Sequence, residues 1–169
     1  EALARAGLLG RLPVTGGPAG YDPVPHAHAD IVVKAKAGVI DVYFLGDSIT
    51  RRWHANDYPE LQKNWRQNFF GWNAANFGWG GDRTENVLWR LANGELDGVN
   101  PKVVVLMIGT NNIGDAPAVN DTTSHRVVRD IRAIVDAIEN KAPGAKIVLM
   151  GITPRNANGS TDAMPTINC

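Results

Sequence analysis

The chain has 169 residues, of which 44% are hydrophobic and 20% are charged, and its 17 basic and 17 acidic side chains give a formal net charge of zero. This composition is typical of one globular domain with a sizeable core and excludes a disordered segment. No basic stripe indicates nucleic acid, and no apolar run is long enough to span a membrane. The single cysteine, Cys169, excludes an internal disulfide framework and a cysteine metal cluster.

The first segment, residues 1–30, is interrupted throughout by Gly and Pro, which predicts an extended N-terminal arm. Residues 31–37 then predict a short helix, and we expect residues 31–169 to form the domain. A start at Glu1 is compatible with a removed signal peptide, a cloning scar or a trimmed start. Of the compartments, a secreted or periplasmic one is slightly favoured over the cytoplasm.

Four short apolar runs, each of which meets a Gly at its end, predict strands at residues 42–45, 74–77, 103–108 and 147–150. Because these runs do not alternate with polar residues, they are typical of strands buried on both faces of a parallel sheet. Helical patterns lie between them, at residues 48–68, 84–92 and 122–140. The last has one apolar stripe, made by Val127, Val128, Ile131, Ile134, Val135 and Ile138.

This alternation of strands and helices predicts a three-layer α/β sandwich around a parallel sheet. Ligands of such sheets bind beyond the carboxyl ends of the strands. Three of the predicted strands end in polar, Gly-rich segments, which are Gly46–Ser48, Gly78–Asp82 and Gly109–Asn112. The topology therefore brings three distant segments to one rim of the sheet.

Ser48 follows an apolar strand and opens a helix, where backbone N–H groups and the helix dipole favour negative charge. Attack of its hydroxyl on an ester would create an oxyanion close to those donors. Taken alone, Ser48 is better explained as an ordinary N-cap. The Gly-x-Ser-x-Gly elbow of α/β-hydrolases is absent, because Thr50 stands at the position of the second Gly.

Gly81 and Asn111 are candidate oxyanion donors. The backbone of a glycine can approach a ligand closely, and an Asn side chain is a neutral amide donor. Each has a plainer reading, as a residue of a Gly-rich turn and as a turn residue at a strand end. Ser48, Gly81 and Asn111 occur in this order after three successive strands, and together they favour the site of a serine esterase.

Several segments resemble the SGNH (GDSL-like) hydrolase superfamily, in particular its branch of intracellular platelet-activating-factor acetylhydrolase catalytic subunits and their bacterial relatives. The resemblance covers roughly residues 38–168 and is carried by Val42–Thr50, Asn76–Thr84, Val87–Leu91, Gly94–Leu96, Pro101–Val105 and Gly109–Asn112. It implies a flavodoxin-like sandwich of five parallel strands. It also implies that Ser48 is the nucleophile, with the Ser48 and Gly81 N–H groups and the Asn111 amide as the oxyanion hole.

The family's Asp-x-x-His, which supplies the general base, does not occur in this sequence. Of the four histidines, His26 and His28 lie in the arm, where two ligands make a poor metal site. His54 lies on the helix that Ser48 opens, and His125 lies near the start of the long helix as a solvated residue. We therefore expect a shortened form of a longer enzyme that lacks the C-terminal strand and helix, with a sheet edge open to homo-oligomer formation.

The leading hypothesis is a serine esterase that hydrolyses short acyl esters, acetyl esters above all, without a metal or organic cofactor. A carbohydrate acetyl esterase is an alternative, in which Trp53, Trp72 or Trp79 would stack on sugar rings. A second alternative is an inactive fragment that binds esters or assembles. We expect Asp47 to hold its loop by accepting backbone N–H groups and Asp82 to cap the following helix, and we assign neither a catalytic role.

Overall fold

The computed structural model describes residues 39–53, 55, 58–113 and 121–153. Four parallel strands form one sheet in the order β2-β1-β3-β4. The strands are β1 (Val42–Gly46), β2 (Ala74–Gly78), β3 (Val103–Met107) and β4 (Lys146–Leu149). The helices are α3 (Ser48–Arg52), α4 (Pro59–Asn68), α5 (Thr84–Ala92), α6 (Thr110–Ile113) and α7 (Asp121–Lys141), with the 3₁₀ turn η1 at Phe70–Trp72.

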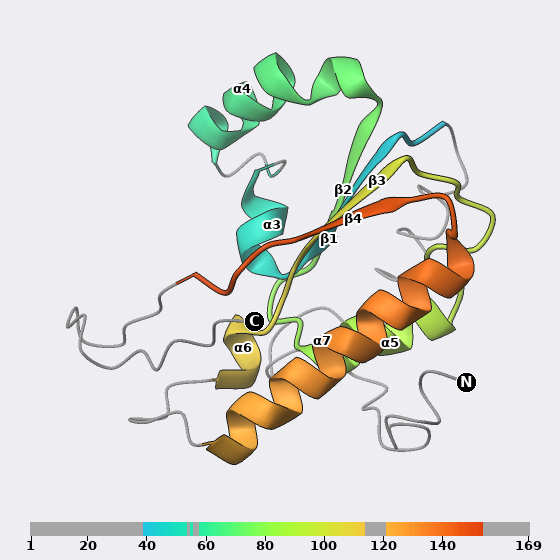
Figure 1. The fold of residues 1–169 in the computed structure, drawn as a ribbon. Coiled ribbons are helices and arrows are strands. Elements are labelled where there is room, and N and C mark those ends of the chain that lie inside the picture. The colour runs from blue at the N-terminus through green and yellow to red at the C-terminus, as the bar shows by residue number, and fades with distance from the viewer. Residues whose placement is uncertain (1–38, 54, 56–57, 114–120, 154–169) are drawn as a thin grey trace.

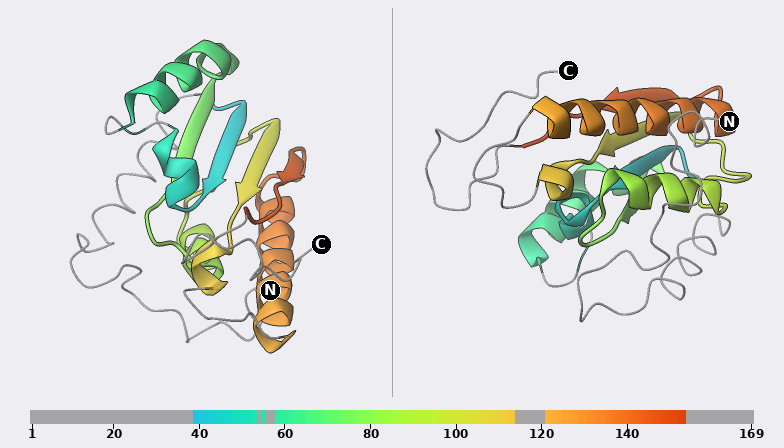
Figure 2. Two further views of the ribbon diagram at one scale, coloured as in Figure 1. Left: turned by 90° about the vertical axis from the view of Figure 1, so that its left-hand side faces the viewer. Right: turned by 90° about the horizontal axis from the view of Figure 1, so that it is seen from below.

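Helices lie on both faces of the sheet, as Figures 1 and 2 show. The helices α5 and α7 pack side by side on one face, and α3 and α4 lie on the other. The short helix α6 lies beyond the end of β3, next to the beginning of α7. The predicted three-layer α/β sandwich with a parallel sheet is therefore confirmed for the described residues.

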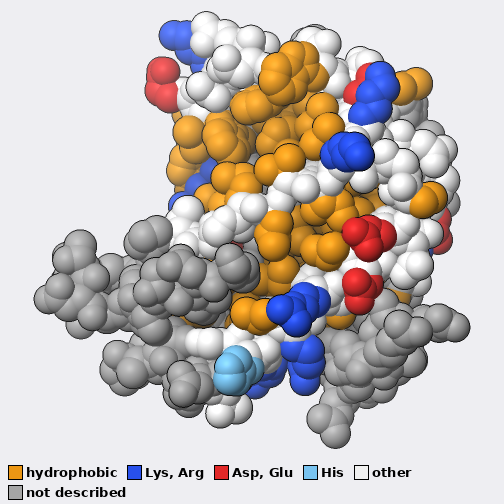
Figure 3. All heavy atoms as spheres, in the orientation of Figure 1, with side chains coloured by type: hydrophobic (Ala, Val, Ile, Leu, Met, Phe, Trp, Pro, Cys, Tyr) orange, Lys and Arg blue, Asp and Glu red, His pale blue; other side chains and the backbone are white. Residues whose placement is uncertain are grey.

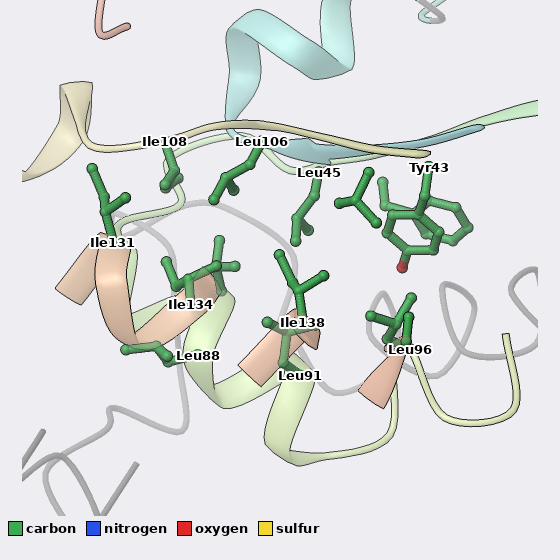
Figure 4. Close-up of a cluster of buried hydrophobic side chains, with 14 of the residues drawn as sticks. Tyr43, Leu45, Leu88, Leu91, Leu96, Leu106, Ile108, Ile131, Ile134 and Ile138 are labelled. Atoms are coloured by element: carbon green, nitrogen blue, oxygen red, sulfur yellow. The ribbon is translucent and has the colours of Figure 1, made fainter. Parts of the chain in front are cut away.

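The main core lies between the sheet and the helices α5 and α7 (Figure 4). Side chains of β1 and β3 point from the sheet toward the apolar stripes of the two helices. The stripe predicted for α7 is confirmed, because Val127, Ile134 and Ile138 have no exposed surface. The largest residues of this core are Tyr43, Leu45, Phe77, Leu88, Leu91, Leu96, Leu106 and Ile108. Burial of apolar side chains on this scale is what fixes the helices against the sheet.

All four predicted strands are present, with ends that differ by one residue or so from the apolar runs. The prediction that every strand is buried on both faces is wrong for β4. This strand is at the edge of the sheet, and Val148, Leu149 and Met150, at and just after its end, are 49%, 42% and 37% exposed. Figure 3 shows hydrophobic side chains gathered on this side of the molecule. An apolar run alone therefore did not distinguish an edge strand from a central one.

The single helix predicted for residues 48–68 is also wrong, because α3 ends at Arg52 and α4 begins at Pro59. Proline disfavours helical dihedrals in the residue before it, and Tyr58 accordingly has φ −130° and ψ 74°. The elements η1 and α6 were not predicted from the sequence, because they contain only three and four residues and show no helical periodicity. The helices predicted at 84–92 and 122–140 are confirmed as α5 and α7.

Some predictions fall outside the described residues, namely the N-terminal arm at 1–30, the short helix at 31–37, and Cys169. Within the part of the chain that the structure describes, no helix is both long enough and apolar enough to cross a membrane.

Gly78 at the end of β2 lies so close to the backbone at the start of α3 that a larger residue should destabilise the fold. A Cβ at this position would lie 2.3 Å from the Arg51 backbone nitrogen and 2.8 Å from the Asp47 carbonyl oxygen, both in the first turn of α3. We expect Gly78→Ala to lower the free energy of unfolding by ~1–3 kcal/mol, because backbone atoms have to move. Chemical denaturation checks this value.

The matched control is Gly71→Ala, since a Cβ on Gly71 would meet no atom within 4 Å. This control should leave the denaturation midpoint unchanged or slightly raised. Equal stability of the Gly78→Ala and Gly71→Ala variants would contradict the close contact between β2 and α3.

Candidate active site

Ser48 is the first residue of α3, and one residue separates it from the end of β1 at Gly46. Asp47 between them is the helix N-cap, is 1% exposed, and accepts a hydrogen bond from the Ile49 backbone N–H at 2.9 Å. The prediction that Asp47 holds this loop through backbone N–H groups is confirmed. Ser48 itself is partly exposed at the helix N-terminus, where unpaired backbone donors and the dipole favour an anion.

The end of β2 is held against the turn that carries Ser48. The Asn76 side chain donates to the Thr50 carbonyl at 2.6 Å and accepts from the Gly78 N–H at 2.9 Å. The Trp79 N–H donates to the Gly46 carbonyl at 3.0 Å. These bonds fix the segment after β2 to the segment that leads into Ser48.

Gly81 lies in the turn after β2, with a φ of +79°. A side chain is strained in this region of backbone space, whereas glycine adopts it readily. The next residue, Asp82, closes the turn by donating its N–H to the Trp79 carbonyl at 3.3 Å. The structure thus places Gly81 in a turn, which is the plainer of the two readings that the sequence left open, and the role of its N–H as an oxyanion donor stays a prediction.

Asn111 lies on α6, beyond the end of β3. Its side-chain amide donates to the Asp82 carbonyl oxygen at 2.7 Å, so the structure brings Asn111 to the turn that contains Gly81. An amide nitrogen carries two hydrogens, and this bond uses one of them.

Asn112 supports the same arrangement from the next position of α6. Its side-chain oxygen accepts from the Thr84 N–H at 2.9 Å, and its nitrogen donates to Thr84 Oγ1 at 2.9 Å and to Glu85 Oε2 at 2.8 Å. Thr84 Oγ1 also donates to Asp130 of α7 at 3.2 Å. The start of α5, the helix α6 and α7 are therefore connected by side-chain hydrogen bonds beside the turn.

The prediction that Asp82 caps the following helix is wrong. The N-cap of α5 is Arg83, whose N–H donates to the Asn86 side chain at 2.9 Å. Asp82 is instead 2% exposed, and its Oδ2 lies 2.8 Å from Nη2 of Arg90. Burial raises the pKa of Asp82 to about 7; the Arg90 charge opposes this rise, while the charges of Glu95 and Asp47 add to it.

Arg90 occupies the centre of a buried charged cluster that the sequence analysis missed. Its Nη1 donates to Glu95 Oε2 at 2.7 Å and to the Phe77 carbonyl at 3.1 Å, and Glu95 also accepts from the Tyr43 hydroxyl at 3.1 Å. Burial lowers the pKa of Arg90, but the nearby Glu95 and Asp82 charges outweigh this, so that its pKa is raised. The available signal was a charged residue between Leu88 and Leu91, on the apolar side of α5.

The remaining candidates are histidine and tryptophan side chains, of which Trp79 belongs to the turn that contains Gly81. His125 is exposed on α7, whereas His26, His28 and His54 lie outside the described residues. Trp53 and Trp72 pack edge-on against Phe69, and Trp79 packs against the main core. Among residues 39–53, 55, 58–113 and 121–153, no group of three or more His, Cys, Asp or Glu side chains could hold a metal ion.

Similarity to known proteins covers most of the chain. The GDSL-like Lipase/Acylhydrolase family model matches residues 44–167. Human platelet-activating factor acetylhydrolase IB subunit alpha2 is 38% identical over 145 residues, which cover 78% of this chain and 58% of that protein. Human subunit alpha1 is 39% identical over 128 residues, which cover 76% of this chain and 50% of that protein. The chain thus spans about half the length of these relatives.

A solved structure from Streptococcus pneumonia, of a candidate platelet activating factor, is similar in fold. It superposes with a TM-score of 0.51 at 25% identity, over 78% of this chain and 57% of that one. The family match over residues 44–167 includes Ser48, Gly81 and Asn111.

The raised pKa of Asp82 predicts a pH dependence of stability. The folded protein binds this proton more tightly than the unfolded chain, whose carboxyl has the ordinary pKa of 3.8. The contribution of Asp82 to the free energy of unfolding is therefore fully present below pH 3.8 and is lost as the pH rises through about 7.

We expect the Tm of the wild-type chain, measured relative to Asp82→Asn, to fall by several degrees between pH 4 and pH 7 and to level off above that. Asparagine is the matched substitution because it keeps the size of the side chain and has no carboxyl group that titrates. Differential scanning calorimetry across this range measures both variants. A Tm difference that does not change with pH would contradict the raised pKa.

Proposed function

The chain belongs to the GDSL-like lipase/acylhydrolase family, and we propose on this basis that its site hydrolyses short acyl esters with Ser48 as the nucleophile. The observation that carries the proposal is the Asn111–Asp82 hydrogen bond of 2.7 Å, which joins Asn111 to the residue that directly follows Gly81. The third, Ser48, begins α3 two residues after Gly46, whose carbonyl accepts from Trp79 of the same turn.

In the proposed reaction the Ser48 oxygen attacks the carbonyl carbon of the ester, and negative charge develops on the carbonyl oxygen. The backbone N–H groups of Ser48 and Gly81 and the second amide hydrogen of Asn111 would donate to that oxygen. Such donors act without rearrangement because the turn is already fixed by its hydrogen bonds. The acyl group passes to Ser48, the alcohol leaves, and water releases the acid.

The serine hydroxyl needs a general base to accept its proton, since an unassisted hydroxyl is a weak nucleophile. The sequence of this chain contains no Asp-x-x-His to provide one. An oxyanion hole alone supports weak residual catalysis in serine hydrolases whose base has been removed. We therefore expect slow acyl transfer to Ser48 from an activated ester.

Acetyl is the acyl group that we propose. The two human relatives, which are 38% and 39% identical to this chain over the matched lengths, are named as acetylhydrolases. The chain has no net charge, which suits a neutral ester better than a highly charged substrate.

Replacement of the nucleophile tests the assignment directly. We expect Ser48→Ala to abolish the release of 4-nitrophenol from 4-nitrophenyl acetate, because no other atom replaces the attacking oxygen. It should also abolish stoichiometric labelling by a fluorophosphonate, measured by intact mass. The labelled fraction of the Ser48→Ala chain should fall to background, because removal of the nucleophile eliminates the covalent step.

Ser124→Ala is the matched control, because Ser124 lies on α7 and is also partly exposed. It should react at the wild-type rate. Unchanged labelling of Ser48→Ala would show that the nucleophile is elsewhere. A wild-type chain of 18.2 kDa that neither turns over nor becomes labelled would favour the non-catalytic alternative.

A further inference from the structure

Asp82 connects two parts of the proposed oxyanion hole, the Gly81 segment and the Asn111 amide. Its backbone carbonyl accepts the Asn111 amide at 2.7 Å, its N–H closes the turn on Trp79, and its peptide bond connects it to Gly81. The position of Asp82 therefore determines both the direction of the Gly81 segment and the placement of the Asn111 amide.

Arg90 is the cation that pairs with the Asp82 carboxyl group among the residues that the structure describes. The Oδ2–Nη2 distance is 2.8 Å, and neither atom makes an aligned hydrogen bond with the described residues. The contact between the carboxyl group and the guanidinium is therefore electrostatic. The same guanidinium donates at 3.1 Å to the Phe77 carbonyl in β2, just before the turn begins. Arg90 therefore holds both ends of the turn, at Phe77 and at Asp82.

Packing does not require a charge at this position. Arg90 is 3% exposed, and removing a guanidinium from water is costly unless several partners compensate for it. Replacement of a buried ion pair by apolar residues of similar volume is often neutral or stabilising. A buried arginine that bridges Asp82, Glu95 and Phe77 is better explained by the geometry that it imposes on the turn.

We propose that Arg90 is a positioning residue for the esterase site, which sets the placement of the Gly81 N–H and the Asn111 amide through its ion pair with Asp82. The inference rests on the proposed function for its catalytic consequence, but its structural content can be measured separately. Arg90 acts through Asp82 and does not contact the ester.

The variant Arg90→Met removes the charge while keeping a long side chain that can pack in the same space. Arg90→Lys keeps the charge but has a single ammonium, which cannot bridge Asp82, Glu95 and the Phe77 carbonyl together. The matched control is Tyr43→Phe, which breaks the 3.1 Å hydrogen bond to Glu95 in the same cluster without a contact to Asp82. All three variants should lower the Tm, so stability alone does not distinguish them.

The first measurement is a ¹⁵N–¹H correlation spectrum of each variant below its Tm. We expect Arg90→Met to move the Gly81 amide peak and the Asn111 side-chain peaks, with smaller movements in Arg90→Lys. Tyr43→Phe should leave these peaks in place. Unmoved Gly81 and Asn111 peaks in Arg90→Met, or equal movements in Tyr43→Phe, would overturn the inference whether or not the chain is an esterase.

The second measurement is the rate of Ser48 labelling by a fluorophosphonate, separated into binding of the reagent and the covalent step. Misplaced oxyanion donors slow the covalent step, by roughly 10- to 100-fold. We expect this loss in Arg90→Met with little change in reagent binding, partial recovery in Arg90→Lys, and a rate within about twofold of wild type in Tyr43→Phe, which leaves the donors in place.

The two measurements distinguish the two proposals. Moved Gly81 and Asn111 peaks in a chain whose Ser48 is never labelled would support positioning by Arg90 and contradict the proposed function. Ser48-dependent labelling that Arg90→Met leaves at the wild-type rate would support the proposed function and overturn the role of Arg90.

Discussion

The parallel register of the sheet is the constraint on which the candidate site depends. Gly46 pairs with Gly78 of β2 and with Met107 of β3, so three strands end at the same level. Segments that are about thirty residues apart along the chain therefore leave the sheet at one edge. Without this register, neither the turn after β2 nor the helix α6 would lie beside the start of α3.

Short polar contacts then convert this edge into a defined arrangement. The two glycines at the strand ends leave no room for a Cβ, which would lie 2.4 Å from the Met107 carbonyl oxygen at Gly46 and 2.3 Å from the Arg51 nitrogen at Gly78. The close approach of β1, β2 and α3 thus requires glycine at both positions. Beyond them, Asp82 connects the Gly81 turn to α6 through its carbonyl and to α5 through its carboxylate. The hydrogen bond from Asn111 and the buried pair with Arg90 are therefore both made by Asp82.

Much of the fold was predictable because it follows from short-range patterns. The apolar runs predicted the four strands, and the apolar stripe of α7 predicted its buried face. The Gly-rich segments after three of the strands predicted the edge of the sheet at which the candidate site lies. The single helix at 48–68 was a wrong prediction because helical periodicity continued across a boundary that Pro59 imposes. The site residues Ser48, Gly81 and Asn111 were also named from the sequence, and the structure links the last two through Asp82.

The sequence by itself determined the element types, the family and the chemical identity of the candidate donors, because residue type and spacing along the chain carry that information. Only the tertiary structure decided the partner of Asp82. The spacing from Asp82 to the start of α5 suggested a helix cap, yet burial places its carboxylate against Arg90, eight residues further along the chain. A buried charged side chain pairs with an opposite charge that folding brings close to it. The residue pattern along the chain does not specify which charge that is. The apolar run of β4 likewise does not specify how exposed its side chains are, because that exposure depends on which elements pack against the strand.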